Sequence, residues 1–326
     1  MLALIEITAW HWVSFIAAVL VFLVLDLGVF HRHAHVVRFR EAFTWTAICF
    51  VLAMVFAATL VPVRGAEEAT EFVTGYLIEL SLSMDNVFVI ALIFAYFRVP
   101  LQFQHRVLFW GILGALVMRG LMIWIGAALI SRFDWMLYVF GAFLILTGVR
   151  MVFSDQEGVH PEKNPVLRAA RRLFPVSNDF HGQRFTTRLN GRFALTPIAL
   201  VLLMVETSDL IFALDSIPAI FAVTQKPFIV FTSNVFAILG LRSLYFVLAN
   251  ALSYFRYLKF GLALVLVFIG TRMLVRYFDI EIPTGVSLLV VVGLILVSML
   301  VSVFMAKRQQ DRDGDSSPDD RDEADE

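Results

Sequence analysis

Long apolar runs recur from one end of this chain to the other, and they leave few folds open to it. Each run approaches the roughly 20 residues that a helix needs to cross a bilayer. The composition agrees, because 60% of the 326 residues are hydrophobic and only 16% are charged. These features predict an all-α polytopic membrane protein. Nine spans are expected, at residues 9–30, 43–63, 71–96, 105–130, 134–153, 194–223, 228–250, 256–276 and 284–305.

The basic residues between the spans indicate their orientation, because cytoplasmic loops carry an excess of Lys and Arg. The connectors after the first, third, fifth and seventh spans hold 15 such residues, counting Arg150 at a span end, and the alternate connectors hold five. We therefore expect the N-terminus outside and the C-terminus in the cytoplasm. The first run lacks the basic start and the cleavage site of a signal peptide, so it is predicted to be a retained span.

Two of the apolar runs contain carboxylates where a membrane helix ordinarily has none. Residues 79–94 read ELSLSMDNVFVIALIF, and residues 206–221 read ETSDLIFALDSIPAIF. A charged side chain at the bilayer centre costs about 2.5–3.5 kcal/mol on insertion scales, so these acids need partners. Acids that touch headgroup water at helix ends would explain one or two of them, whereas a cation site would explain all. The five acids are Glu79, Asp85, Glu206, Asp209 and Asp215.

The donor groups in these segments are all oxygens, a set that suits Mg, Ca or Mn rather than Cu or Zn. The predicted metal ligands are Glu79, Asp85, Asn86, Glu206, Asp209 and Asp215, with the hydroxyls of Thr207, Ser208 and Ser216 nearby. On an unbroken helix, Glu79 and Asp85 are about 120° apart and about 9 Å apart along the axis. We therefore expect local unwinding to bring these groups toward one point.

Two arginines inside the spans, Arg119 and Arg242, are the candidates for compensating the acids. Five acids against two arginines leave three formal negative charges. One divalent ion and one proton would neutralise them, which favours exchange of a metal for protons. Buried carboxylates can also be protonated without any transport role. No permanently bound cofactor is expected, and the single cysteine, Cys49, excludes a disulfide within the chain.

An internal repeat organises the middle of the chain. Residues 140–151, with FG and GVRM, match residues 260–273, with FG and GTRM. The ILG at 112–114 likewise resembles the ILG at 238–240, and the two acidic segments match one another. Each copy holds three spans, an odd number, so the copies should run in opposite directions across the membrane. Inverted repeats of this kind build many secondary transporters, with the site at their interface.

The predicted organisation follows from these features. It comprises two N-terminal spans (1–70), a first repeat (71–153), a cytoplasmic loop (154–193), a second, inverted repeat (194–276), a C-terminal span (277–306) and a disordered acidic tail (307–326). The loop could contain an amphipathic helix near residues 166–173 that lies on anionic headgroups, or it could be a tether. The HRHAH histidines at 31–35 are either metal contacts or a solvated group.

Three segments carry a resemblance to a known family. GYLIELSLSMDNVFV, FDWMLYVFGAFLILTGVRM and VETSDLIFALDSIPAIFAVTQKPFIVFTSNVFAILGLRSLYF resemble the TerC family of integral membrane proteins, and most closely its Alx-like branch. The resemblance extends to about residue 305. It implies Mn²⁺ export across a bacterial inner membrane and kinship with the LysE-like exporter superfamily. It places the acidic motifs of the family on the predicted ligands named above. The family is also associated with tellurite resistance.

The leading interpretation is a secondary transporter that exports Mn²⁺ by proton antiport, with Mn²⁺, protons and the lipid bilayer as its partners. A channel would use the same residues. A non-transporting scaffold or stress-response component is the alternative, with the acids paired to Arg119 and Arg242. An enzyme is not expected, because the spans lack HExxH, GxSxG or a His beside a nucleophile. Nucleic acid is not an expected partner, and an oligomer or accessory membrane partners are left open.

Overall fold

The structure is a computed structural model that describes residues 7–25, 39–153, 164–177, 179–180, 182, 184–189, 191–248, 258–278 and 282–315. The HRHAH segment at 31–35 and residues 316–326 lie outside the described residues, and the predictions made on them stay predictions.

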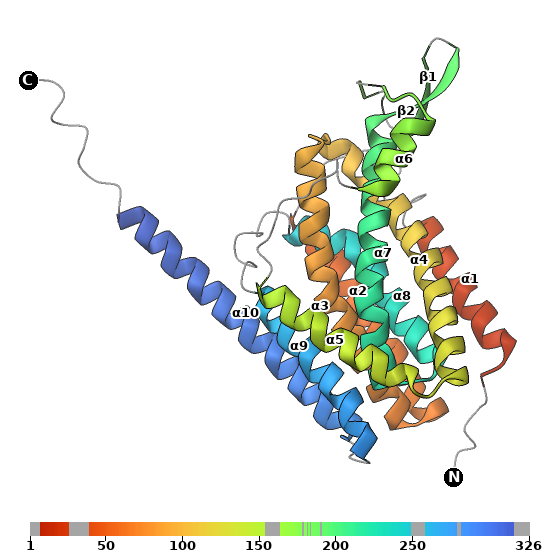
Figure 1. The fold of residues 1–326 in the computed structure, drawn as a ribbon, viewed down its shortest axis with the longest axis vertical. Coiled ribbons are helices and arrows are strands. Elements are labelled where there is room, and N and C mark those ends of the chain that lie inside the picture. The colour runs from red at the N-terminus through yellow and green to blue at the C-terminus, as the bar shows by residue number, and fades with distance from the viewer. Residues whose placement is uncertain are drawn as a thin grey trace, which may run out of the picture.

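Ten α-helices and one short hairpin form the described fold (Figure 1). The helices are α1 (Ala9–Leu25), α2 (Phe39–Arg64), α3 (Ala66–Tyr96), α4 (Leu101–Arg132), α5 (Met136–Phe153), α6 (Pro165–Leu173), α7 (Pro197–Val223), α8 (Pro227–Leu248), α9 (Leu258–Val275), with a 3-10 turn at Arg276–Phe278, and α10 (Thr284–Asp315). The antiparallel strands β1 (Thr186–Leu189) and β2 (Arg192–Leu195) precede α7.

The apolar runs of the sequence become the long helices. Within the described residues, eight helices are long and apolar enough to cross a membrane, and α1, with 17 residues, is apolar but shorter. Prolines mark several helix starts, because a proline at the first turn loses no helical hydrogen bond. Thr196, for example, caps α7 by accepting from the Ala199 N–H, with Pro197 at the first position. The prediction of an all-α polytopic membrane protein is confirmed.

The polar loop contains the amphipathic helix that its sequence predicts. In α6, the Asn164 Oδ1 accepts from the N–H groups of Val166 (2.9 Å) and Leu167 (3.1 Å), and this cap starts the helix. Leu167 and Ala170 are buried and α6 packs on α7, while Arg171 and Arg172 are exposed. A position of α6 against anionic headgroups stays a prediction.

The structure corrects the predicted boundaries in two places. The sixth span was predicted to begin at residue 194, but residues 194 and 195 belong to β2 and the helix begins only at Pro197. The hairpin has a signal that the prediction missed, an Asn-Gly pair whose Gly191 has φ +78°. At the other end, α10 continues to Asp315, although residues 307–315 were predicted to be disordered. Lys, Arg and Gln are good helix formers, so a polar composition does not end a helix there.

Four helices form the centre of the bundle. Helices α3 and α4 each pack on both α7 and α8, α2 covers α3 and α8, and α10 lies along α9 and α3. Helices α3 and α7 are antiparallel (Figure 1). The Thr224 Oγ1, just after α7, donates to the Glu71 Oε2 near the start of α3 (2.8 Å), whereas Asn86 farther along α3 contacts Asp209 of α7. The two acidic segments of the sequence therefore face each other.

Helices α5 and α9, which contain the two FG motifs, cross in close contact. A Cβ atom built on Gly270 would lie 2.6 Å from the Gly141 carbonyl oxygen, and one on Gly141 would lie 3.0 Å from the Gly270 carbonyl oxygen. Glycine at both positions permits this approach. The contact joins corresponding helices of the two predicted copies, and the inverted symmetry itself stays a prediction.

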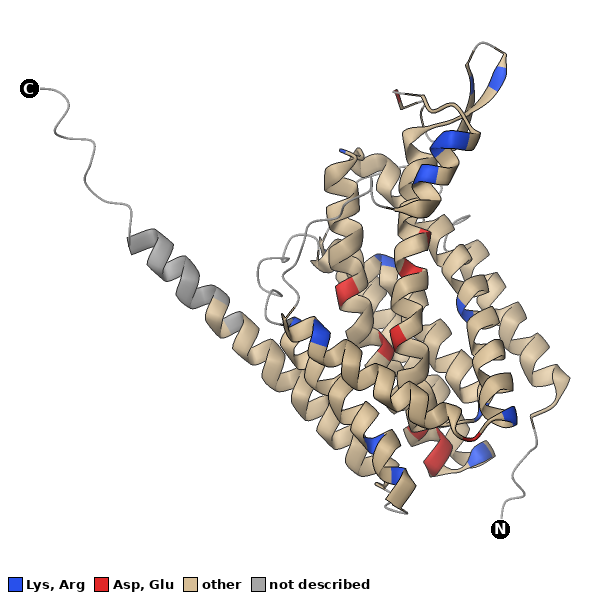
Figure 2. Cartoon of the chain, viewed as in Figure 1, with Lys and Arg blue, Asp and Glu red and all other residues tan. Residues whose placement is uncertain are grey.

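Charged positions are sparse along the helices of the bundle (Figure 2). Blue basic positions mark α6 and the hairpin at one end, and red acidic positions lie both midway along the central helices and at the opposite end (Figure 2). The first group of acids includes the predicted ligands, and the second lies at the start of α3. Which end faces the cytoplasm stays a prediction.

Candidate ion-binding site

Arg119 of α4 lies at the centre of the bundle with 2% of its surface exposed. Its Nη2 donates to the Asp209 Oδ1 (2.9 Å) and its Nε to the Asp209 Oδ2 (3.2 Å), a bidentate pair with α7. Its Nη1 donates to the Glu79 Oε1 of α3. Such fork-shaped pairs are strong and geometrically specific. One guanidinium thus joins the two facing acidic segments.

Neutral polar groups complete the network around this arginine. The Asn234 Oδ1 of α8 accepts from the Arg119 Nη1 (3.0 Å), and the Asn234 Nδ2 donates to the Glu79 Oε2 (3.2 Å). The Asn86 Nδ2 donates to the Asp209 Oδ1 (3.3 Å), and the Ser216 Oγ accepts from the Arg119 Nη1 (3.3 Å). We call this set the Arg119 cluster: Arg119, Glu79, Asp209, Asn86, Asn234 and Ser216. Asn234 was not among the predicted ligands, although an amide inside an apolar helix is itself a signal of a functional site.

The Arg119 cluster has an unbalanced formal charge. Two carboxylates face one guanidinium, so the cluster carries one net negative charge when both acids are ionised. Glu79 is fully buried and Asp209 is 8% exposed, which leaves little room for solvent to screen them. A buried charge is tolerated only when it is paired and hydrogen-bonded. A bound cation or a proton would restore the balance.

Glu206 lies one helical turn before Asp209, against α4. A Cβ atom on Gly114 would collide with both carboxylate oxygens of Glu206, so this glycine provides the space that the side chain fills. Among the described residues, three buried side-chain oxygen atoms have no hydrogen-bond partner: the Glu206 Oε2, the Asn86 Oδ1 and the Ser83 Oγ. Oxygens of this kind are suited to a cation or to a donated proton.

Asp85 and Asp215 face a different set of helices. The Asp215 Oδ1 accepts from the Thr147 Oγ1 of α5 (3.2 Å), and Asp85 lies within the electrostatic influence of Lys259 of α9. In the part of the chain that the structure describes, no three Asp, Glu, His or Cys side chains come together as a metal-binding group. The structure therefore brings Glu79, Asn86 and Asp209 together without gathering all five acids around one point.

Regular helices explain this arrangement, and the expected local unwinding is wrong for this structure. Both α3 and α7 are continuous through their acidic segments, with Pro218 inside α7. The Ser81 hydroxyl donates to the Leu77 carbonyl (2.6 Å), and Thr207 and Ser208 donate to carbonyls one turn back. These hydroxyls bond to intact helices instead of replacing broken backbone bonds. The ligand roles of the six predicted residues stay predictions.

The two candidate compensating arginines differ in their surroundings. Arg119 lies between two of the acids, whereas the Arg242 Nη1 of α8 lies 3.1 Å from the His105 Nε2 of α4. Both side chains are buried. Each of the two arginines follows one of the two matching ILG motifs. Their offsets from the ILG motifs differ by three residues, which puts them at different depths and faces of their helices.

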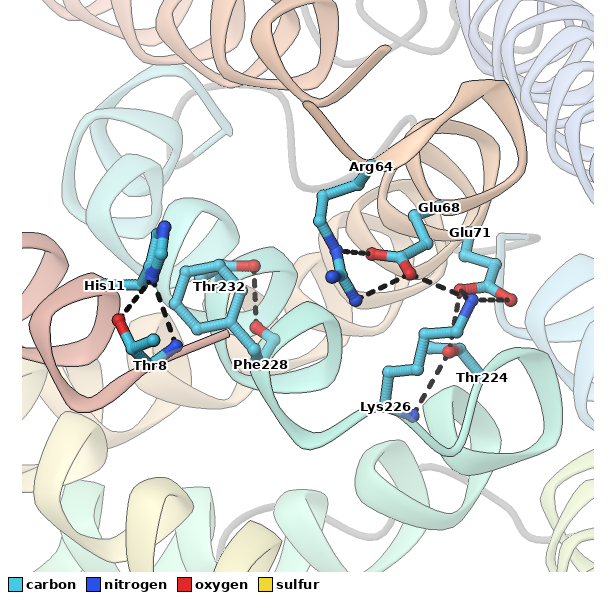
Figure 3. Close-up of polar contacts among 9 residues, drawn as sticks. All are labelled: Thr8, His11, Arg64, Glu68, Glu71, Thr224, Lys226, Phe228 and Thr232. Atoms are coloured by element: carbon cyan, nitrogen blue, oxygen red, sulfur yellow. Dashed lines mark hydrogen bonds and ion pairs between the residues drawn. The ribbon is translucent and has the colours of Figure 1, made fainter. Parts of the chain in front are cut away.

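A second charged cluster lies at the start of α3 (Figure 3). Arg64 at the end of α2 makes two bonds to Glu68, of 2.7 and 2.8 Å. The Lys226 Nζ, on the connector between α7 and α8, lies 3.3 Å from the Glu68 Oε1 and 3.2 Å from the Glu71 Oε2. Partial burial lowers the pKa of Lys226, but Glu71 and Glu68 outweigh it and raise the pKa above its usual value. We call this set, with Thr224, the Lys226 cluster.

The fold and the buried charges define a polytopic membrane protein with an ionic centre. The family description "Integral membrane protein TerC family" matches residues 64–312. This chain belongs to the TerC family, as the resemblance in its motifs predicts. No solved structure matches it significantly.

Relatives are similar over nearly their whole length. An "Uncharacterized membrane protein" of Myxococcus xanthus is 52% identical over 305 residues, which cover 94% of this chain and 95% of the relative. The "Putative membrane-bound redox modulator Alx" of Escherichia coli (strain K12) is 44% identical over 312 residues, 93% of this chain and 97% of the relative. A Rickettsia felis membrane protein is 39% identical over 292 residues, 90% of this chain and 97% of the relative.

Proposed function

We propose that this protein is a secondary transporter that exports a divalent cation, Mn²⁺ in the first place, from the bacterial cytoplasm. The observation that carries the proposal is the Arg119 cluster, in which buried carboxylates of two antiparallel helices exceed the cation between them. A protein with only a structural task would gain stability from an equal number of charges, or from none. An excess of acid in an apolar bundle favours a mobile cation as the missing partner.

In this proposal Arg119 holds the site when the exported ion is absent. Its guanidinium stands between Glu79 and Asp209, where a cation bound by both carboxylates would also lie. Entry of the ion therefore requires the guanidinium to give up at least one carboxylate. Asn86, Asn234 and Ser216 then offer neutral oxygens, and an all-oxygen set accepts Mn²⁺ while disfavouring the softer metals.

Proton antiport is the proposed driving reaction. Glu206, Asp85 and Asp215 are carboxyl groups outside the direct bonds of Arg119, and each can carry a proton when the ion has left. Release of one divalent ion to the outside and uptake of two protons would keep the interior charge constant. The proposed orientation has the α6 end in the cytoplasm and the start of α3 outside, following the Lys and Arg distribution.

One observation favours a second candidate function. Arg119 already bonds to two carboxylates and to two neutral groups, so the cluster could serve only to hold the helices together. The protein would then be a non-transporting membrane component, for example in a stress response. The E. coli relative is named for redox modulation, and the name states no transported ion.

Metal flux in proteoliposomes tests the proposal directly. We expect the parent protein to move Mn²⁺. The flux should be faster when a proton gradient drives protons in the direction opposite to the metal. Asp85→Asn and Asp215→Asn keep the shape of the side chain and remove its charge, so the variants should insert normally and lose most of the flux. Glu67→Gln removes an exposed acid at the start of α3 and serves as the matched control.

Two outcomes would overturn the transport proposal. One is a parent protein that moves no Mn²⁺ in either gradient. The other is a pair of well-folded Asn variants whose flux equals that of the Glu67→Gln control. The second candidate function would then be the better account of the buried acids.

A further inference from the structure

The Lys226 cluster joins elements that the Arg119 cluster also joins, but one level farther toward the end of the bundle. It ties the end of α2 and the start of α3 to the connector between α7 and α8 (Figure 3). Glu71 and Glu79 lie eight residues apart on α3, which is about 12 Å along the helix. The antiparallel α3–α7 pair is therefore held by ionic groups at two separate depths.

Tight packing closes the space between these two depths. A Cβ atom on Gly75 of α3 would lie 2.9 Å from the Ser233 Oγ of α8 and 3.4 Å from the Ile220 Cγ2 of α7. Thr74 and Ile78, on the same stretch of α3, are fully buried. Even a methyl group at position 75 would displace Ser233, so α3, α7 and α8 are in close contact at this level. The centre of the bundle is thus separated from the start of α3 in this conformation.

On the outer side of this closed stretch lies a polar cavity of about 940 Å³. Its wall includes Glu71 together with Asp134 in the turn between α4 and α5, and Arg272 and Arg276 at the end of α9. Glu71 therefore contributes both to the cavity wall and to the bond with Lys226. A change in that bond would alter the inner wall of the cavity.

We propose that the Lys226 cluster is a latch that keeps this end of the α3–α7 pair closed. Lys226 is on a connector of only three residues, 224–226, so moving it moves the end of α7 and the start of α8. Its bonds to Glu68 and Glu71 cross from that connector to α3, and Thr224 adds a third crossing bond. When they break, the connector and the end of α7 separate from α3.

The chemistry of the cluster suits a reversible closure. Two cations, Arg64 and Lys226, face two acids, Glu68 and Glu71, so the cluster is neutral and needs no further ion in the closed state. The Lys226 side chain is 40% exposed whereas those of Glu68 and Glu71 are 8% exposed, so water can solvate the ammonium group as soon as it leaves the two acids. Movement of short connectors at helix ends is a common form of domain opening. As the outer gate of the Arg119 cluster, the latch rests on the proposed transport function, but its closure can be tested alone.

Cysteine accessibility tests the latch without any transport assay. Cys49→Ala removes the single cysteine, and Thr74→Cys introduces a reporter on α3 one turn inside Glu71. The protein is reconstituted in nanodiscs and exposed to a membrane-impermeant charged thiol reagent. We expect slow labelling with Lys226 present and about tenfold faster labelling in Lys226→Gln, because loss of the bonds raises the open population. Lys226→Arg keeps the charge and should stay slow.

Arg132→Gln is the matched control, because it removes an exposed positive charge in the last turn of α4 and touches none of the Lys226 cluster. Equal labelling rates in Lys226→Gln and Arg132→Gln would overturn the latch. If Lys226→Gln loses helical content, Glu71→Gln provides the same comparison with Lys226 still bonded to Glu68. The result stands apart from the flux experiment, since a latch can open in a protein that moves no metal.

Discussion

The Arg119 cluster and the Lys226 cluster both consist of basic side chains bonded to carboxylates, but they differ in net charge and in burial. In the Arg119 cluster, one arginine that is 2% exposed bonds to two acids in the middle of the bundle. In the Lys226 cluster, two cations bond to two acids at its end, and the lysine is 40% exposed. The deeper cluster thus has the less balanced charge, although burial makes imbalance most costly there.

In the proposed function, this contrast separates a structural ionic group from one that binds the transported ion. The end of the bundle has what stability alone would select, a neutral and partly hydrated network. The centre retains an extra carboxylate where a balanced or apolar core would be more stable. The acid that needs an explanation is therefore the one without a matching cation. Because the two clusters differ in charge and burial, we expect them to respond differently to the same kind of mutation.

The largest expected effect follows removal of the central charge. Arg119→Gln leaves Glu79 and Asp209 facing each other without a cation, and we expect a loss of about 3–5 kcal/mol in the free energy of unfolding. Thermal unfolding in detergent or nanodiscs measures it. Adding Asp209→Asn to this variant should recover part of the loss, because only one acid then remains. A double variant no more stable than Arg119→Gln would show that the charges do not interact as the structure indicates.

A smaller effect is expected at the glycine beside Glu206. Gly114→Ala places a methyl group in the space of the Glu206 carboxylate, so the side chain must move at a cost of about 1–3 kcal/mol. Gly293→Ala in α10 meets no atom within 4 Å and is the matched control. Melting temperatures of both variants check the prediction. Equal melting temperatures would mean that the Glu206 side chain can move away from α4 without a loss of stability.

The smallest effect concerns Lys226 and its pH dependence. Its pKa is raised in the folded protein, so the stabilisation is complete below the ordinary value of 10.5 and is lost as the pH rises through the higher folded value. The groups that face the lysine are Glu68, Glu71 and Thr224, with Arg64 beyond Glu68.

We therefore expect the stability difference between the parent and Lys226→Gln to be below about 1 kcal/mol and constant from neutral pH to about pH 10. Above that range the difference should shrink. Unfolding followed across this range measures it. A difference that already disappears near pH 8 would contradict a raised pKa and a closed ion pair.

The sequence was sufficient for most of the fold, because hydrophobic length and proline position decide where membrane helices lie. Each predicted span corresponds to an apolar helix, and α6 begins and ends close to its predicted limits. The 186–195 hairpin was not predicted, because its two strands have only four residues each and the Asn-Gly pair is the main local signal of the turn. The extension of α10 was missed because a charged composition was equated with disorder.

The site was only partly predictable, for a geometric reason. Spacing along one helix reveals which acids share a face, but it cannot say which neighbouring helix that face meets. The acids Glu79 and Asp209 meet the arginine of α4, whereas Asp215 meets Thr147 of α5. The participation of Asn234 depends on the packing of α8 against α3. Tertiary contacts of this kind are not encoded in any local pattern.

Binding of Mn²⁺ to the purified protein tests the central claim most directly. Equilibrium dialysis at neutral pH compares the parent with Asp209→Asn, which removes the excess acid at the centre, and with Glu71→Gln, which removes an acid from the balanced cluster. Asp209→Asn leaves Arg119 paired with Glu79, so we expect it to fold. The account predicts binding by the parent and by Glu71→Gln, and an affinity about tenfold or more weaker in Asp209→Asn, since one charged ligand is lost. Equal affinity in all three proteins, or none in the parent, would contradict it.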